Sequence, residues 1–186
     1  VGAYAVYAAD LDGDGDIDVL SASNTDNKIT WHENLGGGAI DTTQQIITIN
    51  ADGARSVYAS DLDGDGDLDV LSASWSGNST SGNGDDNVAW HENLGSGTFG
   101  PLQKLSSYEK KPYCVYAADL DNDGDLDVLS GTWYDSKVTW YENLGGGNFG
   151  RQQIITTNVS GVTSVYAADL DGDGDMDVLS SSWSTG

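Results

Sequence analysis

Short runs of β-branched and aromatic residues alternate with strongly polar turns along the whole chain of 186 residues. The segments recur in a fixed order: a strand-like run, an acidic stretch, a second such run, a run that ends in Trp-x-Glu-Asn, a glycine-rich turn and a last short run. Short runs bounded by Gly, Asp, Asn and Ser are typical of strands, whereas helices need about ten residues or more. The pattern therefore predicts an all-β chain built from one repeated unit.

The repeat unit is defined by its acidic stretches, which begin at Asp10, Asp61, Asp119 and Asp169. The unit is about 50 residues long, and one unit carries an insertion between Trp75 and Asn87. Each unit offers four strands: a first at Ala3 to Ala8, Arg55 to Ser60, Tyr113 to Ala118 and Thr163 to Ala168; a second after the acidic stretch, as in Asp69 to Trp75; a third at Lys28 to Asn34, Asn87 to Asn93 and Lys137 to Asn143; and a fourth at Gln44 to Thr48, Leu102 to Ser106 and Gln152 to Thr156. Four short antiparallel strands per unit, stacked in series, are the arrangement of a β-propeller blade.

The chain is predicted to form about three and a half blades. Blade 1 covers residues 1–50, blade 2 covers 51–107, blade 3 covers 108–158, and a half blade covers 159–186. Because such an open array leaves strand edges unpaired, we expect further blades, either from a longer parent polypeptide or from repeats of the same or another chain. Two such arrays would give a seven-bladed propeller.

The acidic stretches place five carboxylates in nine residues, in the pattern Asp-x-Asp-Gly-Asp-Gly-Asp-x-Asp, with Asn122 replacing the first Gly in the third copy. Such carboxylates repel one another by roughly 3 kcal/mol per close pair at an effective dielectric of about 20, so a cation is expected among them. Carboxylate oxygens at this spacing suit Ca2+. We assign the side chains at positions 1, 3, 5 and 9 and the backbone carbonyl at position 7 as ligands of four Ca2+ sites. The aspartates concerned are Asp10, Asp12, Asp14, Asp16 and Asp18; Asp61, Asp63, Asp65, Asp67 and Asp69; Asp119, Asp121, Asp123, Asp125 and Asp127; and Asp169, Asp171, Asp173, Asp175 and Asp177.

The EF-hand is the nearest competing pattern, and it requires a Glu at position 12 and a helix on each side. Position 12 is serine in every copy: Ser21, Ser72, Ser130 and Ser180. The flanking runs are short and rich in β-branched and aromatic residues. The acidic stretch is therefore predicted to join two strands of a hairpin.

Composition narrows the classes of partner. The formal net charge is −23, and the four stretches hold 20 of the 30 acidic residues, so four bound Ca2+ ions would reduce the charge to about −15. Only seven Lys and Arg are present, which does not favour nucleic acid, and no apolar run is long enough for direct membrane insertion. The single cysteine, Cys114, aligns with Ala5, Ser56 and Ser164 and is expected to be a small buried strand residue.

The repeated Val-Tyr-Ala-Ala-Asp-Leu-Asp-Gly-Asp-Gly-Asp-x-Asp-Val-Leu segment, with Phe99-Gly100 and Phe149-Gly150 closing units, resembles FG-GAP (VCBS-type) repeats. These repeats form the calcium-binding propeller of integrin α subunits and recur in secreted proteins and lectins. The resemblance implies one Ca2+ in the first hairpin of each blade. The sequence departs from the family name after the second strand, where Ser-Ala-Ser-Trp or Ser-Ser-Ser-Trp replaces Gly-Ala-Pro.

An enzyme is not expected, because the polar residues that could act in catalysis repeat with the structure. One position of the repeat is always glutamate, at Glu33, Glu92 and Glu142, which indicates a role in fixing a turn. The position before it is His32, His91 or Tyr141. Candidates for ligand binding are Trp75, Trp133 and Trp183, at the end of the second strand, although packing between blades is the simpler interpretation; the non-repeated segments Ser76 to Asp86 and Tyr108 to Pro112 are further candidates.

The sequence thus predicts a non-catalytic, extracellular calcium-binding propeller module for adhesion, recognition or structural assembly, with a protein or glycan ligand. The alternatives are a calcium-dependent, lectin-like carbohydrate-binding propeller and an accessory propeller of a secreted polysaccharide-degrading enzyme. Asn78 and Asn158 begin N-glycosylation sequons, consistent with a secreted or cell-surface glycoprotein.

Overall fold

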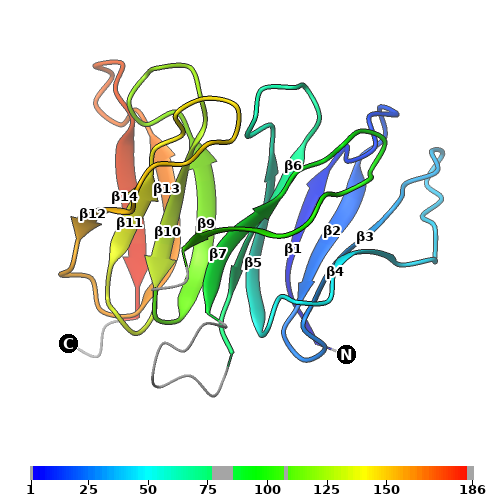
Figure 1. The fold of residues 1–186 in the computed structure, drawn as a ribbon, viewed down its shortest axis with the longest axis horizontal. Coiled ribbons are helices and arrows are strands. Elements are labelled where there is room, and N and C mark those ends of the chain that lie inside the picture. Colours follow the sequence, from blue (N-terminus) through cyan, green and yellow to red (C-terminus); the bar gives the residue numbers. More distant parts are fainter. Residues whose placement is uncertain (1, 77–85, 107–108, 184–186) are drawn as a thin grey trace.

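The computed structural model describes residues 2–76, 86–106 and 109–183, which form strands and turns without a helix (Figure 1). The strands are β1 (Ala3–Ala9), β2 (Asp18–Ser23), β3 (Lys28–His32) and β4 (Gln45–Thr48); β5 (Ala54–Ser60), β6 (Asp69–Ser74), β7 (Asn87–His91) and β8 (Gln103–Ser106); β9 (Pro112–Ala118), β10 (Asp127–Thr132), β11 (Val138–Tyr141) and β12 (Gln153–Thr156); and β13 (Val162–Ala168) and β14 (Asp177–Ser182). Among the described residues, no helix has the length and apolar character needed to span a membrane.

The strands form three four-stranded sheets and one two-stranded sheet, each antiparallel and ordered as in the chain. The sheets stand side by side, with the acidic hairpins at the top of the view (Figure 1). This arrangement confirms the predicted series of about three and a half blades, and the array is not closed. The total of seven blades stays a prediction.

The third strand of each blade ends earlier than predicted. It was expected to run to Asn34, Asn93 or Asn143, but β3, β7 and β11 end two residues before these asparagines. Each asparagine instead forms an isolated bridge across the following loop, as between Asn143 and Phe149. The strand ends here because the Asn143 Oδ1 accepts a hydrogen bond from Gly145 N, which turns the backbone out of the sheet.

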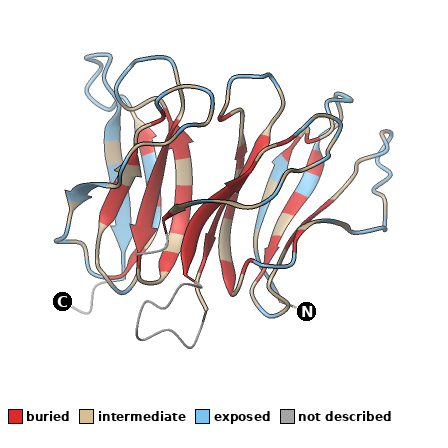
Figure 2. Ribbon diagram, in the orientation of Figure 1, coloured by how far each residue is buried: buried red, intermediate tan, exposed pale blue. Residues whose placement is uncertain are grey.

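The core lies between the sheets. In one cluster, Leu20, Ile29 and Trp31 of the first sheet pack against Ala54 and Val57 of the second, and similar clusters join the second sheet to the third and the third to the fourth. Burial is complete in the middle of the array: every residue of β6, β7 and β10 is buried, whereas the outer faces of the first and last sheets are exposed (Figure 2).

A column of tyrosines runs through the first strand of each blade. Tyr7, Tyr58, Tyr116 and Tyr166 follow one another with ring centroids 4.8, 5.0 and 4.7 Å apart. Tilted aromatic pairs at this distance add stability beyond the area they bury. The column holds the first strands of successive blades together along one side of the array.

Candidate metal centres

Each acidic hairpin is organised by its first aspartate. In the first loop, Asp10 Oδ1 accepts a hydrogen bond from Gly13 N and Asp10 Oδ2 accepts one from Gly15 N, both at 2.9 Å. The two glycines adopt φ angles of 78° and 95°, which residues with a Cβ rarely adopt. The backbone therefore coils around the position 1 carboxylate. In the second and fourth loops, Asp61 and Asp169 accept the equivalent two hydrogen bonds from glycine N–H groups.

The third loop replaces the first glycine with Asn122, and the backbone tolerates the change because asparagine accepts a φ of 61°. Asn122 Nδ2 donates to Asp175 Oδ1 at 2.8 Å, so this side chain also joins the third and fourth hairpins.

The position 9 aspartate connects the hairpin to the rest of its blade. Asp69 Oδ2 accepts a hydrogen bond from Leu62 N at 2.9 Å, and its Oδ1 accepts one from Asn93 N at 2.7 Å. The side chain is fully buried, as are Asp18 and Asp127 in the equivalent positions. In the half blade, Asp177 Oδ2 accepts a hydrogen bond from Leu170 N, and the residue is exposed.

Carboxylate oxygens from positions 1, 3 and 9 converge in all four hairpins. The three groups Asp10–Asp12–Asp18, Asp61–Asp63–Asp69 and Asp119–Asp121–Asp127, and the fourth group Asp169–Asp171–Asp177, each offer ligand atoms within 4.8 Å of one another. Two oxygens that each lie about 2.4 Å from one Ca2+ ion are at most about 4.8 Å apart. The residues present therefore fit a single hard cation per hairpin.

The aspartates at positions 5 and 7 are not part of the group formed by positions 1, 3 and 9. In the first hairpin, Asp14 converges with Asp12 and Glu33, a candidate ligand that the sequence did not single out. The Asp16 carboxylate lies against Gly36 in the turn after β3, and the position 7 aspartates join no convergent group among the described residues. The assignment of the position 7 backbone carbonyl as a ligand stays a prediction.

Burial, with no cation bound, raises the pKa of hairpin aspartates at positions 3 and 9. It raises the pKa of Asp69 to about 7 and the pKa of Asp127 to about 6, although both accept backbone hydrogen bonds that act in the opposite direction. Burial also raises the pKa of Asp12 and Asp63. A divalent cation among these oxygens would favour their ionised forms, so the hairpins have an electrostatic reason to bind one.

Successive hairpins are joined through the asparagine that ends the third strand. Asn93 Nδ2 donates to Leu11 O of the preceding blade at 2.8 Å, and Asn143 Nδ2 donates to Leu62 O at 2.7 Å. Both asparagines also bind their own hairpin, at Leu68 O and Leu126 O. The acidic hairpins of the first three blades thus take part in contacts between blades.

The glutamates predicted to fix this turn do so with their backbones. Glu92 O accepts a hydrogen bond from Gly100 N, and Glu142 O accepts one from Gly150 N, both at 2.7 Å. The Glu142 carboxylate accepts a bond from Gln153, outside the turn.

The tryptophans after the second strand lie at the opposite end of the array. Trp75, Tyr113, Trp133 and Trp183 form a chain of ring contacts that crosses from blade 2 to the half blade. The contacts place Trp75 and Trp133, which are partly buried, between blades, whereas Trp183 touches Trp133 but is 68% exposed. The rings also leave a pocket of about 240 Å3, lined by Tyr4, Arg55, Trp75, Tyr113 and Trp133.

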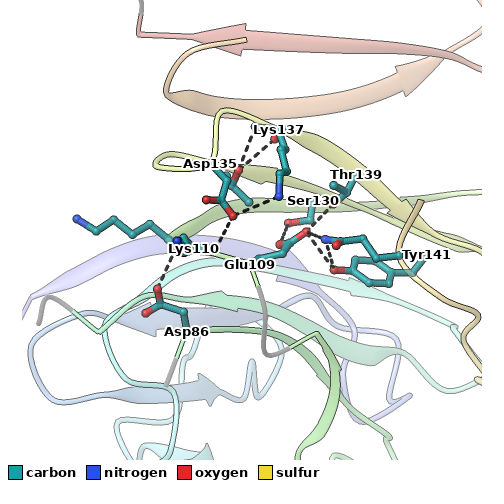
Figure 3. Close-up of polar contacts among 11 residues, drawn as sticks. Asp86, Glu109, Lys110, Ser130, Asp135, Lys137, Thr139 and Tyr141 are labelled. Atoms are coloured by element: carbon teal, nitrogen blue, oxygen red, sulfur yellow. Dashed lines mark hydrogen bonds and ion pairs between the residues drawn. The ribbon is translucent and has the colours of Figure 1, made fainter. Parts of the chain in front are cut away.

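The non-repeated segments meet beside this pocket. Asp86 accepts hydrogen bonds from Ser76 N and Lys111 N, so the insertion and the segment before β9 are joined. Glu109 is buried and accepts bonds from Ser130, Thr139, Tyr141 and Gln152 (Figure 3). Sequence reasoning named both segments but not Arg55 or the role of Glu109.

The remaining sequence predictions concern single residues. Cys114 is buried, and burial raises the pKa of its thiol to about 12, which fits a packing role. His91 is buried with its Nδ1 3.2 Å from Gly100 O, and burial lowers its pKa. Asn158 is exposed, and Asn78 lies outside the described residues.

Serial four-stranded blades with one acidic hairpin each define a propeller-type repeat protein. A family model described as FG-GAP-like repeat matches residues 3–72, 76–130 and 119–180, so the chain belongs to the FG-GAP-like repeat family. No curated protein matches the sequence.

One solved structure shares the fold of this chain. An Agrocybe aegerita lectin, studied for its specific recognition of non-reducing terminal N-acetylglucosamine, superposes with a TM-score of 0.65 at 20% identity, over 96% of this chain and 47% of the lectin chain. The V. cholerae biofilm matrix protein Bap1 matches with a TM-score of 0.40 at 22% identity, over 88% of this chain and 30% of Bap1. The chain therefore spans about half the length of the lectin that it matches.

Proposed function

We propose that the chain is a calcium-stabilised, non-catalytic part of a propeller that recognises a glycan or protein ligand outside the cell. The observation that carries the proposal is the convergence of three carboxylates in every hairpin, at a separation that one Ca2+ ion would bridge. The same three positions converge in all four hairpins, and in three of them the position 9 aspartate is buried, which does not suit a solvated turn.

Energetics support calcium as a folding partner. A site with a dissociation constant near 10^-4 M contributes about 1.4 kcal/mol in roughly 1 mM free calcium, so four sites contribute about 5 to 6 kcal/mol. This is comparable to the net stability of a typical domain. Cytosolic calcium is too scarce to fill such sites, which supports an extracellular location, and the exposed Asn158 sequon is compatible with it.

Two features support a non-catalytic role. The acidic hairpins repeat in every blade, whereas an active site is usually a single irregular group of residues. Glu109, a buried carboxylate outside the hairpins, accepts hydrogen bonds from four neutral donors, which suits a structural residue more than a general acid or base.

A second candidate function is carbohydrate binding. The pocket walls of Trp75, Tyr113 and Trp133 offer the flat apolar surface on which sugar rings stack. The lectin from Agrocybe aegerita shares the fold and is known for a glycan ligand, which makes this candidate worth testing here.

The test is a thermal melt of the chain with Ca2+ and with excess chelator. Calcium is expected to raise the melting temperature by many degrees, because about 5 kcal/mol is a large fraction of domain stability. Asp63→Asn should reduce the calcium-dependent shift, whereas Asp135→Asn, outside the hairpins, should keep it. An identical melt in calcium and chelator would refute the proposal.

A further inference from the structure

The end of the array opposite the acidic hairpins carries most of the Lys and Arg side chains. Five of the seven Lys and Arg residues lie there, at or next to the strand ends: Lys28, Arg55, Lys110, Lys111 and Lys137. The 20 hairpin aspartates lie at the other end. Strands of seven residues separate the two ends by about 20 Å, which exceeds two Debye lengths at physiological ionic strength. Lys28 and Lys137 form ion pairs with Asp26 and Asp135, so within the described residues Arg55, Lys110 and Lys111 are the cations of this end without an ion pair. The hairpin charges are too distant to keep an anion away from these three.

Arg55 is held by aromatic rings instead of by a carboxylate. Its Cζ lies 4.5 Å from the Tyr4 ring centroid and 4.4 Å from that of Trp75, and the Tyr4 and Tyr113 hydroxyls meet beside it. No ion pair to Arg55 occurs within residues 2–76, 86–106 and 109–183. In a chain with 30 acidic residues, a guanidinium left without an acidic partner has its charge available for a ligand.

Hydrogen-bond donors in the same group also lack acceptors. Within the described ranges, Arg55 Nε and Trp75 Nε1 are shielded from solvent and have no partner. Donors of this kind usually have an acceptor in folded proteins, from protein, water or ligand. Oxygen atoms of a bound anion would supply acceptors after a small adjustment of these side chains.

A second cation is fixed at the edge of the pocket. Lys111 Nζ lies 4.5 Å from the Trp75 ring centroid. Its backbone is held because Lys111 N donates to Asp86 Oδ2 at 3.0 Å, Lys110 N donates to Asp135 Oδ2 at 3.2 Å, and Glu109 is buried against blade 3 (Figure 3). The segment is therefore a rigid support for its ammonium group and not a solvated tail.

We propose that the pocket of Tyr4, Arg55, Trp75, Tyr113 and Trp133 binds an acidic sugar residue, with the carboxylate on Arg55 and Lys111 and the ring against Trp133. The pocket volume of about 240 Å3 suits one sugar ring. Arginine matches the planar geometry of a carboxylate, and the indole provides a flat face for the C–H groups of the sugar. This inference rests on the proposed recognition function and names its ligand class.

The test is a titration of the calcium-loaded chain with glucuronate, its methyl ester and acetate, followed through the indole N–H signals in NMR spectra. Glucuronate should bind at least tenfold more tightly than the neutral ester, which has the same ring, and than acetate, which has the charge alone. Equal affinity for glucuronate and either control, or no binding of glucuronate, would overturn the proposal.

Variants locate the site. Arg55→Gln should weaken glucuronate binding at least tenfold, whereas Arg151→Gln, which changes the other, exposed arginine, should leave it unchanged. Lys111→Gln changes a partly exposed side chain and tests the site independently if Arg55→Gln does not fold. It should weaken glucuronate binding at least threefold. Wild-type affinity in a folded Arg55→Gln protein, or in Lys111→Gln, would contradict the assignment.

The calcium melt separates the two proposals, because a calcium-dependent melt without glucuronate binding refutes only this site.

Discussion

The side-chain amide of Asn143, in the third blade, donates a 2.7 Å hydrogen bond to the backbone carbonyl of Leu62, in the acidic hairpin of the second blade. The same asparagine binds Leu126 O and Gly145 N, so one residue joins a turn, its own hairpin and the preceding hairpin. Each inner blade is therefore positioned by the loop that we propose holds the metal of the blade before it.

Asn143→Ala should destabilise the chain by about 2 to 3 kcal/mol, because it removes the donor to the buried Leu62 carbonyl and to the partly buried Leu126 carbonyl. Asn34→Ala is the matched control. Asn34 occupies the equivalent position in the first blade and donates to Ile17 O, within its own hairpin, so its replacement should cost less stability. Urea denaturation in calcium measures both, and equal losses would mean that the contact between blades contributes nothing.

Gly147 should be irreplaceable for a steric reason as well as a conformational one. It adopts a φ of 70°, and a Cβ there would lie 2.7 Å from Cη2 of Trp90 in the preceding blade. Gly38 occupies the same slot in the first blade, with a φ of 86° and open space around it. Gly38→Ala should cost about 1 kcal/mol from backbone strain alone, and Gly147→Ala should cost clearly more. Denaturation midpoints compare the two, and similar values would exclude the steric contact.

Glu109→Gln should destabilise the chain by about 2 kcal/mol. Its carboxylate accepts hydrogen bonds from Ser130, Thr139, Tyr141 and Gln152, and an amide replaces one acceptor oxygen with a donor. Glu142→Gln, where the glutamate accepts one bond from Gln153, is the control and should change stability little. A neutral effect of Glu109→Gln would show that the Glu109 carboxylate is not needed.

The metal-free chain should lose stability as the pH rises. Burial raises the pKa of Asp69 in the folded protein to about 7, above the usual value near 4, so the folded state binds this proton more tightly than the unfolded state. The stabilising effect is complete below about pH 4 and is lost as the pH rises through about 7.

Calcium should reverse this trend, since protons and metal compete for the same carboxylates. Denaturation from pH 5 to 8, with chelator and with Ca2+, measures both slopes. Asp69→Asn removes one titrating group and should reduce the slope in chelator, while Asp127, whose pKa burial raises to about 6, still contributes to it. Parallel curves with and without calcium would contradict the link between Asp69 and metal binding.

Features that depend on local pattern were predictable from the sequence. The hairpins followed from the fixed spacing of aspartates and glycines, because a loop of nine residues is specified by its own backbone conformation. The strands followed from their short length and bounding turns, and their order within each sheet from the repeat.

Features that depend on contacts between blades were not predictable in detail. The repeated asparagine was visible in the sequence, but the acceptor of Asn143 is a backbone carbonyl 81 residues earlier. Arg55 is a departure from the repeat, since Tyr4, Tyr113 and Thr163 occupy the equivalent positions. The arginine at this position of the repeat was visible in the sequence. Its surroundings were not, because the rings around it come from three blades.

The most direct test of the account is the number of calcium ions that one chain binds. Isothermal titration calorimetry on chelator-stripped protein should give four sites per chain, and Asp63→Asn should lower the number to three. Occupancy of four hairpins would agree with the four convergent groups of carboxylates. A chain that folds fully and binds no calcium would contradict it.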